Sequence, residues 1–168
     1  PALTKMITHE REGGTLANVA RYLPGMAEVF PHQAAIRVAA GTEISGRIRY
    51  EEYNFETLNR LSDNCARYLR HCGIERGTRV LLMVRPGLVI DPGMGLRSFL
   101  ICVGRTQPEA LIGIPRAQII SRLSRQSFQS VGIRICIRGG GTFARELMKW
   151  DSSEAFMLAQ TREDELAA

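Results

Sequence analysis

The sequence has little that would place it in a membrane or in an oxidising compartment. No apolar run among its 168 residues approaches the roughly 18 residues that a membrane-spanning helix needs. The polar start, PALTKMITHEREGG, contains no hydrophobic signal core. We therefore expect a cytoplasmic protein without an integral membrane segment. Aromatic residues make up only 7% of the chain, so the core should consist mainly of Leu, Ile, Val and Ala.

Cysteine and histidine are few, and their spacing does not suit a metal site. The four cysteines form no C-x-x-C pair, and no histidine lies at zinc-finger spacing. Cys65 and Cys72 are seven residues apart among apolar neighbours, so we expect buried free thiols, which suit a reducing cytosol. His9, His32 and His71 lack an obvious partner group, which favours surface or capping roles over catalysis.

The charge balance does not point to a nucleic-acid partner. The chain has 22 Lys and Arg against 17 Asp and Glu, a formal net charge of +5. The basic residues are scattered, without a run of five and without an alternation of aromatic and basic residues that would suit base stacking. We interpret them as a solvated basic surface and predict that no nucleic acid is bound.

The first half of the chain predicts a helix, a hairpin and a longer helix. Apolar residues recur at helical spacing over 16–27. Pro24 lies inside this segment and predicts a kink or two short helices. Residues 34–39 and 47–53 alternate as two strands of a β-hairpin around Gly-rich turns. An apolar stripe over 55–72 predicts a helix that is capped by Asn54 and ended by Gly73 in a left-handed turn.

The second half alternates strands and helices. Residues 80–84 form a continuous apolar run, which suits a strand covered on both faces. A helix with an apolar stripe over 96–103, closed by Pro108, and a strand over 110–114 follow, and then a helix that begins near Pro115. A strand at 133–137 and a short helix at 142–149 complete the pattern. In the helix after Pro115 we expect three side chains to face the core: Ile119, Ile120 and Leu123.

A further strand candidate at 88–90 follows the 80–84 run after only three residues. A parallel pair needs a crossover of about a dozen residues or more. Either the two strands form a tight hairpin, or a crossover segment is absent between Gly87 and Leu88; we favour the second interpretation.

The fold class follows from this order. Alternating strands and helices predict an α/β layered structure with a mainly parallel sheet, flanking helices and an N-terminal β-hairpin. We expect a polar segment over residues 1–14 and an α/β subdomain portion over residues 15–168.

Three short motifs invite a chemical interpretation, and for each we favour the structural one. Gly139–Gly141 lacks the lysine of a phosphate-binding loop. The turn at 91–95 follows a strand and precedes a helix, but its glycines do not have dinucleotide-binding spacing. The acidic pairs and clusters at 51–52 and 163–165 lie on polar segments without a sign of a shared cleft. We therefore predict no catalytic, cofactor-binding or metal-binding residue in this chain.

Several segments together resemble one family. They are Tyr53–Leu58, Gly73–Val80, Val89–Gly95 and Gln107–Ala110, and the likeness extends over most of the chain from about Asn18. They are similar to the N-terminal portion of AMP-forming acyl-adenylating enzymes, the acyl-CoA synthetase family. The likeness is greatest to a bacterial branch whose members are named fatty-acyl-CoA ligases, peptide synthases or β-lactone synthetases of olefin biosynthesis. Thr57 and Thr78 depart from the family's usual Glu and Asp.

This resemblance implies a ligase of fatty-acid metabolism that activates a fatty or β-hydroxy fatty acid with ATP and Mg²⁺. The acyl group would pass to CoA or another nucleophile. The family's phosphate loop, ATP-binding aromatic motif, hinge Asp and C-terminal Lys have no counterpart here, so we expect these residues alone to be inactive. The alternative is a stand-alone α/β scaffold or binding module without enzymatic activity.

Overall fold

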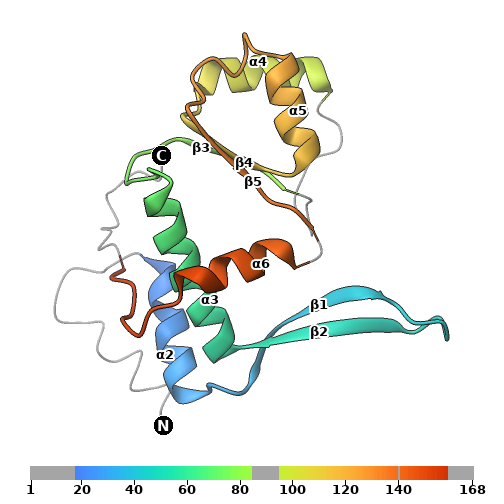
Figure 1. The fold of residues 1–168 in the computed structure, drawn as a ribbon, viewed down its shortest axis with the longest axis vertical. Coiled ribbons are helices and arrows are strands. Elements are labelled where there is room, and N and C mark those ends of the chain that lie inside the picture. The colour runs from blue at the N-terminus through green and yellow to red at the C-terminus, as the bar shows by residue number, and fades with distance from the viewer. Residues whose placement is uncertain (1–17, 85–94, 140, 159–168) are drawn as a thin grey trace. The chain divides into compact units, whose positions relative to one another are not determined.

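A computed structural model describes residues 18–84, 95–139 and 141–158 (Figure 1). The chain divides into two compact units, one formed by residues up to Ala66 and from Trp150 onward, the other by Arg67–Lys149. The predicted polar segment 1–14, the strand at 88–90, the possible missing segment at Gly87–Leu88 and the acidic cluster at 163–165 lie outside the described residues. The division into a 1–14 segment and a 15–168 subdomain stays a prediction.

The first unit opens with the two short helices that Pro24 predicted. A 3₁₀ helix, η1, spans Val19–Arg21, and α2 follows directly over Tyr22–Val29. Pro24 is the third residue of α2, where the missing N–H would have no partner within the helix. The proline is therefore tolerated without a break in α2.

The predicted hairpin is confirmed. Strands β1 (Ala34–Thr42) and β2 (Ile48–Asn54) pair antiparallel and form a two-stranded sheet of their own. The register shifts between Ala39 and Gly41, where Gly41 has a φ of 130° that suits glycine. Both faces of the hairpin expose apolar side chains: Ile36, Val38, Ile48 and Tyr50.

Helix α3 has the ends that the sequence predicts. It spans Phe55–His71, and the Thr57 N–H donates to Asn54 Oδ1 at 2.8 Å, as expected of a capping residue. After the helix, Gly73 has a φ of 87°, the left-handed conformation that ends many helices.

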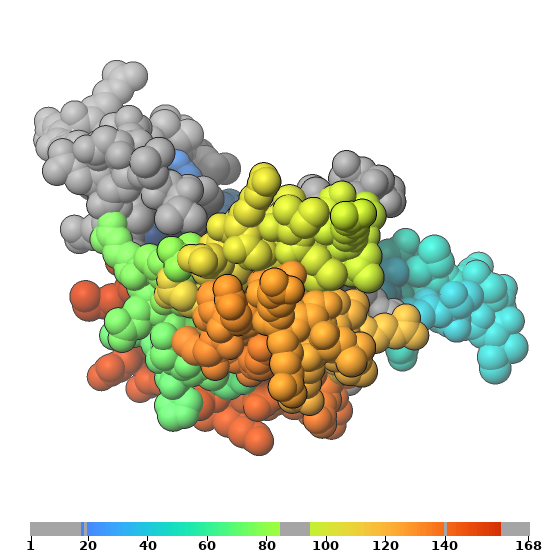
Figure 2. Space-filling view, turned by 90° about the horizontal axis from the view of Figure 1, so that it is seen from above, coloured from blue at the N-terminus to red at the C-terminus, as the bar shows by residue number. Residues whose placement is uncertain are grey.

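The second unit contains a three-stranded parallel sheet in the order β3–β4–β5, which confirms the predicted α/β architecture. The strands are β3 (Val80–Met83), β4 (Ala110–Gly113) and β5 (Ile133–Cys136). Helix α4 (Leu96–Thr106) connects β3 to β4, and α5 (Pro115–Leu123) connects β4 to β5. Figures 1 and 2 show α4 and α5 side by side.

The core of this unit lies between the sheet and α4. Val103, Leu111, Phe128 and Val131 form a buried cluster, and four partly buried side chains pack against it: Leu81, Met83, Phe99 and Leu100. Leu111 and Gly113 share one face of β4, and a side chain at Gly113 would meet Ala117 of α5. Both connecting helices therefore cover the same face of the sheet.

One prediction about the sheet is wrong. The 80–84 run predicts a strand covered on both faces, but Val80 is 40% exposed and Leu82 59% exposed. β3 is an edge strand, and only one of its faces meets the core. The strand that is buried on both faces is the central one, β4.

The orientation of α5 also differs from the prediction. Ile119 is 56% exposed and Leu123 81% exposed, and Ile120 is half-buried. The buried face of the helix consists of Ala117, Gln118 and Ser121. Apolar spacing alone cannot show that small and polar side chains fit the narrow space against the sheet.

The described chain ends with a second short helical pair. Helix α6 spans Thr142–Leu147, and the 3₁₀ helix η2 spans Met148–Trp150, which agrees with the helix expected at 142–149. The Phe143 ring of α6 meets the Tyr68 ring edge to face at a centroid distance of 5.9 Å. Among the described helices, none is long and apolar enough to cross a membrane.

Candidate functional site

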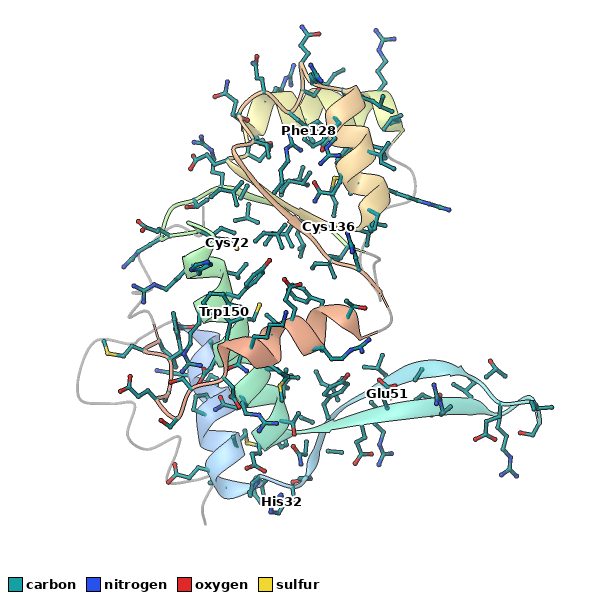
Figure 3. The ribbon with its side chains drawn as sticks, in the orientation of Figure 1. His32, Glu51, Cys72, Phe128, Cys136 and Trp150 are labelled. Atoms are coloured by element: carbon teal, nitrogen blue, oxygen red, sulfur yellow. The ribbon has the colours of Figure 1, made fainter. Side chains whose placement is uncertain are left out.

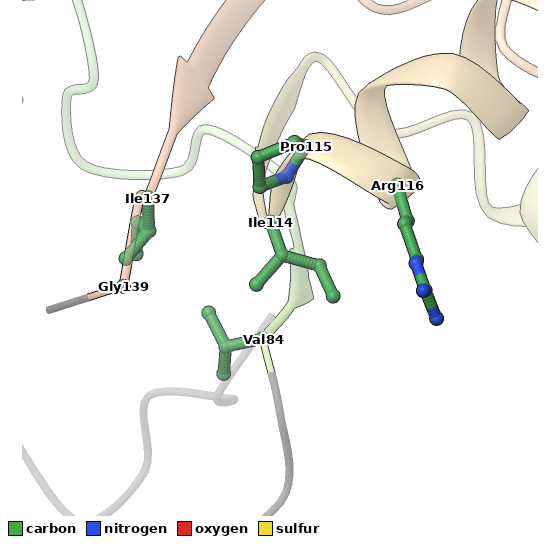
Figure 4. A pocket seen from close by; sticks show the side chains of 6 residues that line it. All are labelled: Val84, Ile114, Pro115, Arg116, Ile137 and Gly139. Carbon is green, nitrogen blue, oxygen red and sulfur yellow. The ribbon is translucent and has the colours of Figure 1, made fainter.

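A cavity of about 540 Å³ lies at the carboxyl edge of the parallel sheet. Three of its lining residues directly follow the strands: Val84 follows β3, Ile114 follows β4 and Ile137 follows β5. The carboxyl ends of parallel strands meet at one edge, which is where ligands bind in open α/β sheets. Pro115, Arg116 and Gly139 complete the described lining (Figure 4).

Backbone hydrogen bonds hold these post-strand residues in place. The Ile114 N–H donates to the Met83 carbonyl at 3.0 Å, and the Ile137 N–H donates to the Gly113 carbonyl at 2.9 Å. Each bond extends the strand ladder one residue beyond the last paired residue. The aliphatic wall is thus positioned by the sheet itself and not by a free loop.

The start of α5 forms the other side of the cavity. Pro115 occupies the first helical position, and the N–H groups of Ala117 and Gln118 both donate to the Ile114 carbonyl, at 2.9 and 3.2 Å. These bonds occupy amides that an anion would otherwise use. Figure 4 shows the Arg116 side chain extending away from Ile114 and Val84, so the guanidinium lies at the rim.

The six described lining residues offer apolar contact and no acid, base or nucleophile. The three aliphatic side chains and Pro115 offer van der Waals contact, and the volume lies within the usual range of small-molecule sites. None of the six lining residues has a carboxylate, imidazole, hydroxyl or thiol that could act as acid, base or nucleophile. The cavity is therefore a candidate binding wall.

Two smaller hollows exist in the same unit. One of about 350 Å³ is lined by Tyr68, Cys136, Arg138, Thr142, Phe143 and Glu146. The other, of about 440 Å³, lies along α4 and the residues that follow α5. Neither offers an orphaned polar group to a ligand, because no buried side-chain nitrogen or oxygen in the described part of the chain lacks a hydrogen-bond partner.

The cysteines show no sign of a reactive or metal-binding centre. Cys65 and Cys72 are half-buried free thiols, whereas Cys102 and Cys136 are exposed. Desolvation by burial raises the pKa of Cys65 above its ordinary value of 9.0, which makes its thiol less nucleophilic at neutral pH. Figure 3 labels Cys72 and Cys136 together with His32 and Glu51.

None of the remaining polar candidates is among the described residues that line the cavity. His32 is exposed, 3.7 Å from a Glu56 carboxylate oxygen, and Glu52 pairs with Arg37 at 2.7 Å on the hairpin. His71 ends α3, and Glu51 is exposed on β2. No group of three or more His, Cys, Asp or Glu side chains within the described ranges could hold a metal ion.

Sequence reasoning missed the cavity. The apolar patterns place Ile114 and Ile137 inside their strands and Val84 inside the first apolar run, whereas each lies one residue past a strand. The signal that points to the site is the position directly after a parallel strand, which requires the strand ends to be known to within one residue. Gly141 lies directly before α6 and has a φ of 71°.

Comparison with known proteins gives relatives of one kind. No family model matches the chain. It is 34% identical over 92% of its length to an olefin beta-lactone synthetase of Xanthomonas campestris pv. campestris, and 31% identical over 90% to one of Stenotrophomonas maltophilia. The chain spans about a third of these relatives, 32% and 31% of their lengths.

A solved structure shares the fold. The Mycobacterium tuberculosis fatty acyl CoA synthetase matches 84% of this chain with a TM-score of 0.54, at 21% sequence identity and over 30% of its own length. At that identity the match shows that the two proteins share this part of the fold.

Proposed function

Since the chain is related in sequence to olefin beta-lactone synthetases, as its motifs indicated, and shares its fold with part of an acyl-CoA synthetase, we propose that it belongs to an ATP-dependent, AMP-forming ligase. The observation that carries the proposal is the 34% identity over 92% of the chain. The substrate we propose is a fatty or β-hydroxy fatty acid.

The proposed reaction has two steps. A carboxylate oxygen attacks the α-phosphorus of ATP, forming the acyl-adenylate as the bond to the β-phosphate breaks and pyrophosphate leaves. A nucleophile then attacks the acyl carbon, and AMP leaves with the carboxylate oxygen that made the attack. If the nucleophile is the substrate's own β-hydroxyl, the product is a β-lactone; if it is the thiol of CoA, the product is a thioester.

The role we propose for this chain is to bind the substrate's hydrocarbon part and to shape the wall of its binding site. The aliphatic cavity at the carboxyl edge suits the hydrocarbon part of such an acid, because apolar contact needs no directed partner. Within the described residues, no group of three or more His, Cys, Asp or Glu side chains could hold Mg²⁺. We therefore assign no step of the reaction to a side chain of this chain.

A second candidate function is a non-catalytic α/β binding or scaffold module. The observation in its favour is the lack of an acid, base or nucleophile among the cavity's lining residues. The two proposals differ in whether the reading frame that encodes this chain also encodes a Ser/Thr/Gly-rich loop that ends in Lys-Gly.

The test uses the complete product of that reading frame. With ATP, Mg²⁺ and a long-chain β-hydroxy acid, we expect AMP release, and hydroxylamine should trap the activated acyl group as a hydroxamate. The same acid without its hydroxyl should give the hydroxamate but no lactone. The 168-residue chain alone should release no AMP. A complete protein that releases no AMP from any long-chain acid would favour the scaffold function.

A further inference from the structure

Helix α5 presents its large aliphatic side chains to the solvent. Ile119 and Leu123 are four residues apart, so they lie on one face, one turn above the other. Their exposed fractions are 56% and 81%. A helix that covers a sheet normally turns such a stripe inward.

Hydrogen bonds on the face of α5 that meets the sheet keep Ile119 and Leu123 on the outer face. Gln118 Nε2 donates to the Ile135 carbonyl at 2.9 Å, and Ser121 Oγ donates to the Gln118 carbonyl at 2.9 Å. Ser121 Oγ in turn accepts a hydrogen bond from Arg134. A rotation of α5 that buried Ile119 would break the two hydrogen bonds between α5 and β5, and the carbonyl of the buried Ile135 would lose its Gln118 donor.

Close packing fixes the same orientation. A β-carbon added at Gly113 would lie 2.9 Å from the Ala117 β-carbon, so the start of α5 sits as near to β4 as glycine and alanine allow. The outward direction of Ile119 and Leu123 is thus set by two independent constraints.

The outward face has the composition of an interface. Arg116 lies three residues before Ile119 and Arg122 three residues after it, so the two arginines flank the aliphatic pair. An apolar centre with a polar rim is the usual anatomy of a protein interface. The rim here is basic, and a complementary surface would carry carboxylates opposite it.

The relatives are about three times as long as this chain. The chain spans 32% and 31% of the two synthetases and 30% of the solved acyl-CoA synthetase. About two thirds of a synthetase-length polypeptide therefore lies outside it. We infer that the Ile119–Leu123 face of α5 is a docking surface for the remainder of that polypeptide, through a surface with an apolar centre and an acidic rim. This inference depends on the sequence relationship to the synthetases and does not depend on the proposed ligase activity.

The test is chemical labelling of the complete protein. In Leu123→Cys, the cysteine at 123 should react with a maleimide at least about tenfold more slowly in the native protein than after unfolding in urea. Modification is quantified on the peptide that contains the residue, so other cysteines do not interfere. Ser45→Cys, in the turn between the hairpin strands, is the control and should react at similar rates in both states. Equal rates at 123 would overturn the inference.

Dilution distinguishes the remainder of the polypeptide from a second copy of the protein. Protection at 123 that disappears as the protein is diluted would mean that a second copy covers the face, which contradicts the proposed occupant. Protection that is independent of protein concentration is the expected result.

A pair of charge variants tests the same face by stability. Leu123→Lys should lower the thermal midpoint of the complete protein by roughly 4 °C or more, and Gln126→Lys, with the same charge change, by about 1 °C or less. Equal shifts would contradict docking whether or not the protein is an active ligase.

Discussion

The two units differ in what they bury. All the buried apolar side chains of the described residues lie in the second unit, between Val103 and Leu147, whereas the buried residue of the first unit is the polar Asn64. The second unit forms a core around three parallel strands, and its central strand β4 is buried on both faces. The hairpin and the helical segments of the first unit bury no apolar side chain fully, and their described apolar side chains are half-buried or exposed.

The hairpin shows the reason most clearly. A two-stranded sheet has two faces and two edges, and a single hairpin is at best marginally stable in water. Ile36 and Val38 lie on one face, and Ile48 and Tyr50 on the other, all between 44% and 58% exposed. In the described residues, the three-stranded sheet has a buried central strand, whereas the two-stranded hairpin leaves its large apolar side chains exposed.

The largest expected effect is in the core of the second unit. Phe128 is 2% exposed and packs in the buried cluster, so Phe128→Ala should lower the free energy of unfolding by about 3–5 kcal/mol. Denaturant unfolding, monitored by hydrogen exchange at the β4 amides, measures this loss in the free energy of unfolding. A loss below about 1 kcal/mol would mean that this cluster is not the core, and the contrast between the units would fail.

The next effect sharpens the account of how α5 meets the sheet. In Gly113→Ala the new methyl group would lie 3.0 Å from the Met83 carbonyl oxygen and 2.9 Å from Ala117, and this overpacking should cost about 1–3 kcal/mol. That exceeds the roughly 0.4–1 kcal/mol gained from a less flexible unfolded chain. Thermal unfolding measures the balance.

Gly132→Ala is the matched control. Nothing lies within 4 Å of its added β-carbon, so the variant should be neutral or slightly more stable. Equal destabilisation by both variants would show that the close approach at Gly113 is not the cause.

A smaller effect belongs to the first unit, where local hydrogen bonds replace a core. Asn54→Ala removes the acceptor for the Thr57 N–H at the start of α3 and should cost about 1 kcal/mol. Asn54→Asp keeps an acceptor and should restore most of the loss. Helix content by circular dichroism and the unfolding midpoint report the change, and an Asp variant no better than Ala would argue against capping.

We also expect a pH-dependent contribution to stability from Cys65, which lies in the first unit. Burial raises its folded pKa above the ordinary value of 9.0, so the folded state holds the thiol proton to a higher pH than the unfolded state does. Its contribution to stability is complete below pH 9.0 and is lost as pH rises through the folded pKa. Unfolding midpoints from about pH 8 to about pH 10.5 should therefore fall less steeply in Cys65→Ala than in the parent. If the unfolding midpoints of the parent and of Cys65→Ala fall with pH at the same slope, the raised pKa of Cys65 is not the cause.

The smallest effect is expected on the hairpin. Tyr50 is 58% exposed, so Tyr50→Ala in the 168-residue chain should change the free energy of unfolding by less than about 0.5 kcal/mol. Denaturant unfolding measures it beside Phe128→Ala. A loss similar to that of Phe128→Ala would break the comparison, because the hairpin would then be packed as a core element is.

Much of the fold could be predicted because local signals determine it. Asn54, Gly73 and Pro115 mark helix ends by mechanisms that depend on a few neighbouring residues, and each holds in the structure. Burial depends on distant residues and was predicted less well. Helix α5 carries its aliphatic residues outward because Gly113 and the Gln118–Ile135 hydrogen bond fix its inner face.

The candidate site was beyond sequence reasoning for a related cause. The cavity depends on strands from three separate segments ending at one edge, with Val84, Ile114 and Ile137 one residue past each strand. No short sequence motif indicates that the ends of three separate strands lie at one edge of the sheet. The family resemblance predicted the kind of relatives that the comparisons found, while the geometry of this chain supplies only the aliphatic wall.

The most direct test of the proposed ligase follows an oxygen atom. The complete protein is incubated with ATP, Mg²⁺ and a long-chain β-hydroxy acid whose carboxylate carries heavy oxygen. Attack by the carboxylate on the α-phosphorus predicts that one heavy oxygen appears in AMP and none in inorganic phosphate, as measured by mass spectrometry. Unlabelled AMP, or heavy oxygen in phosphate alongside ADP, would show that the acid is not activated as an acyl-adenylate and would contradict the account.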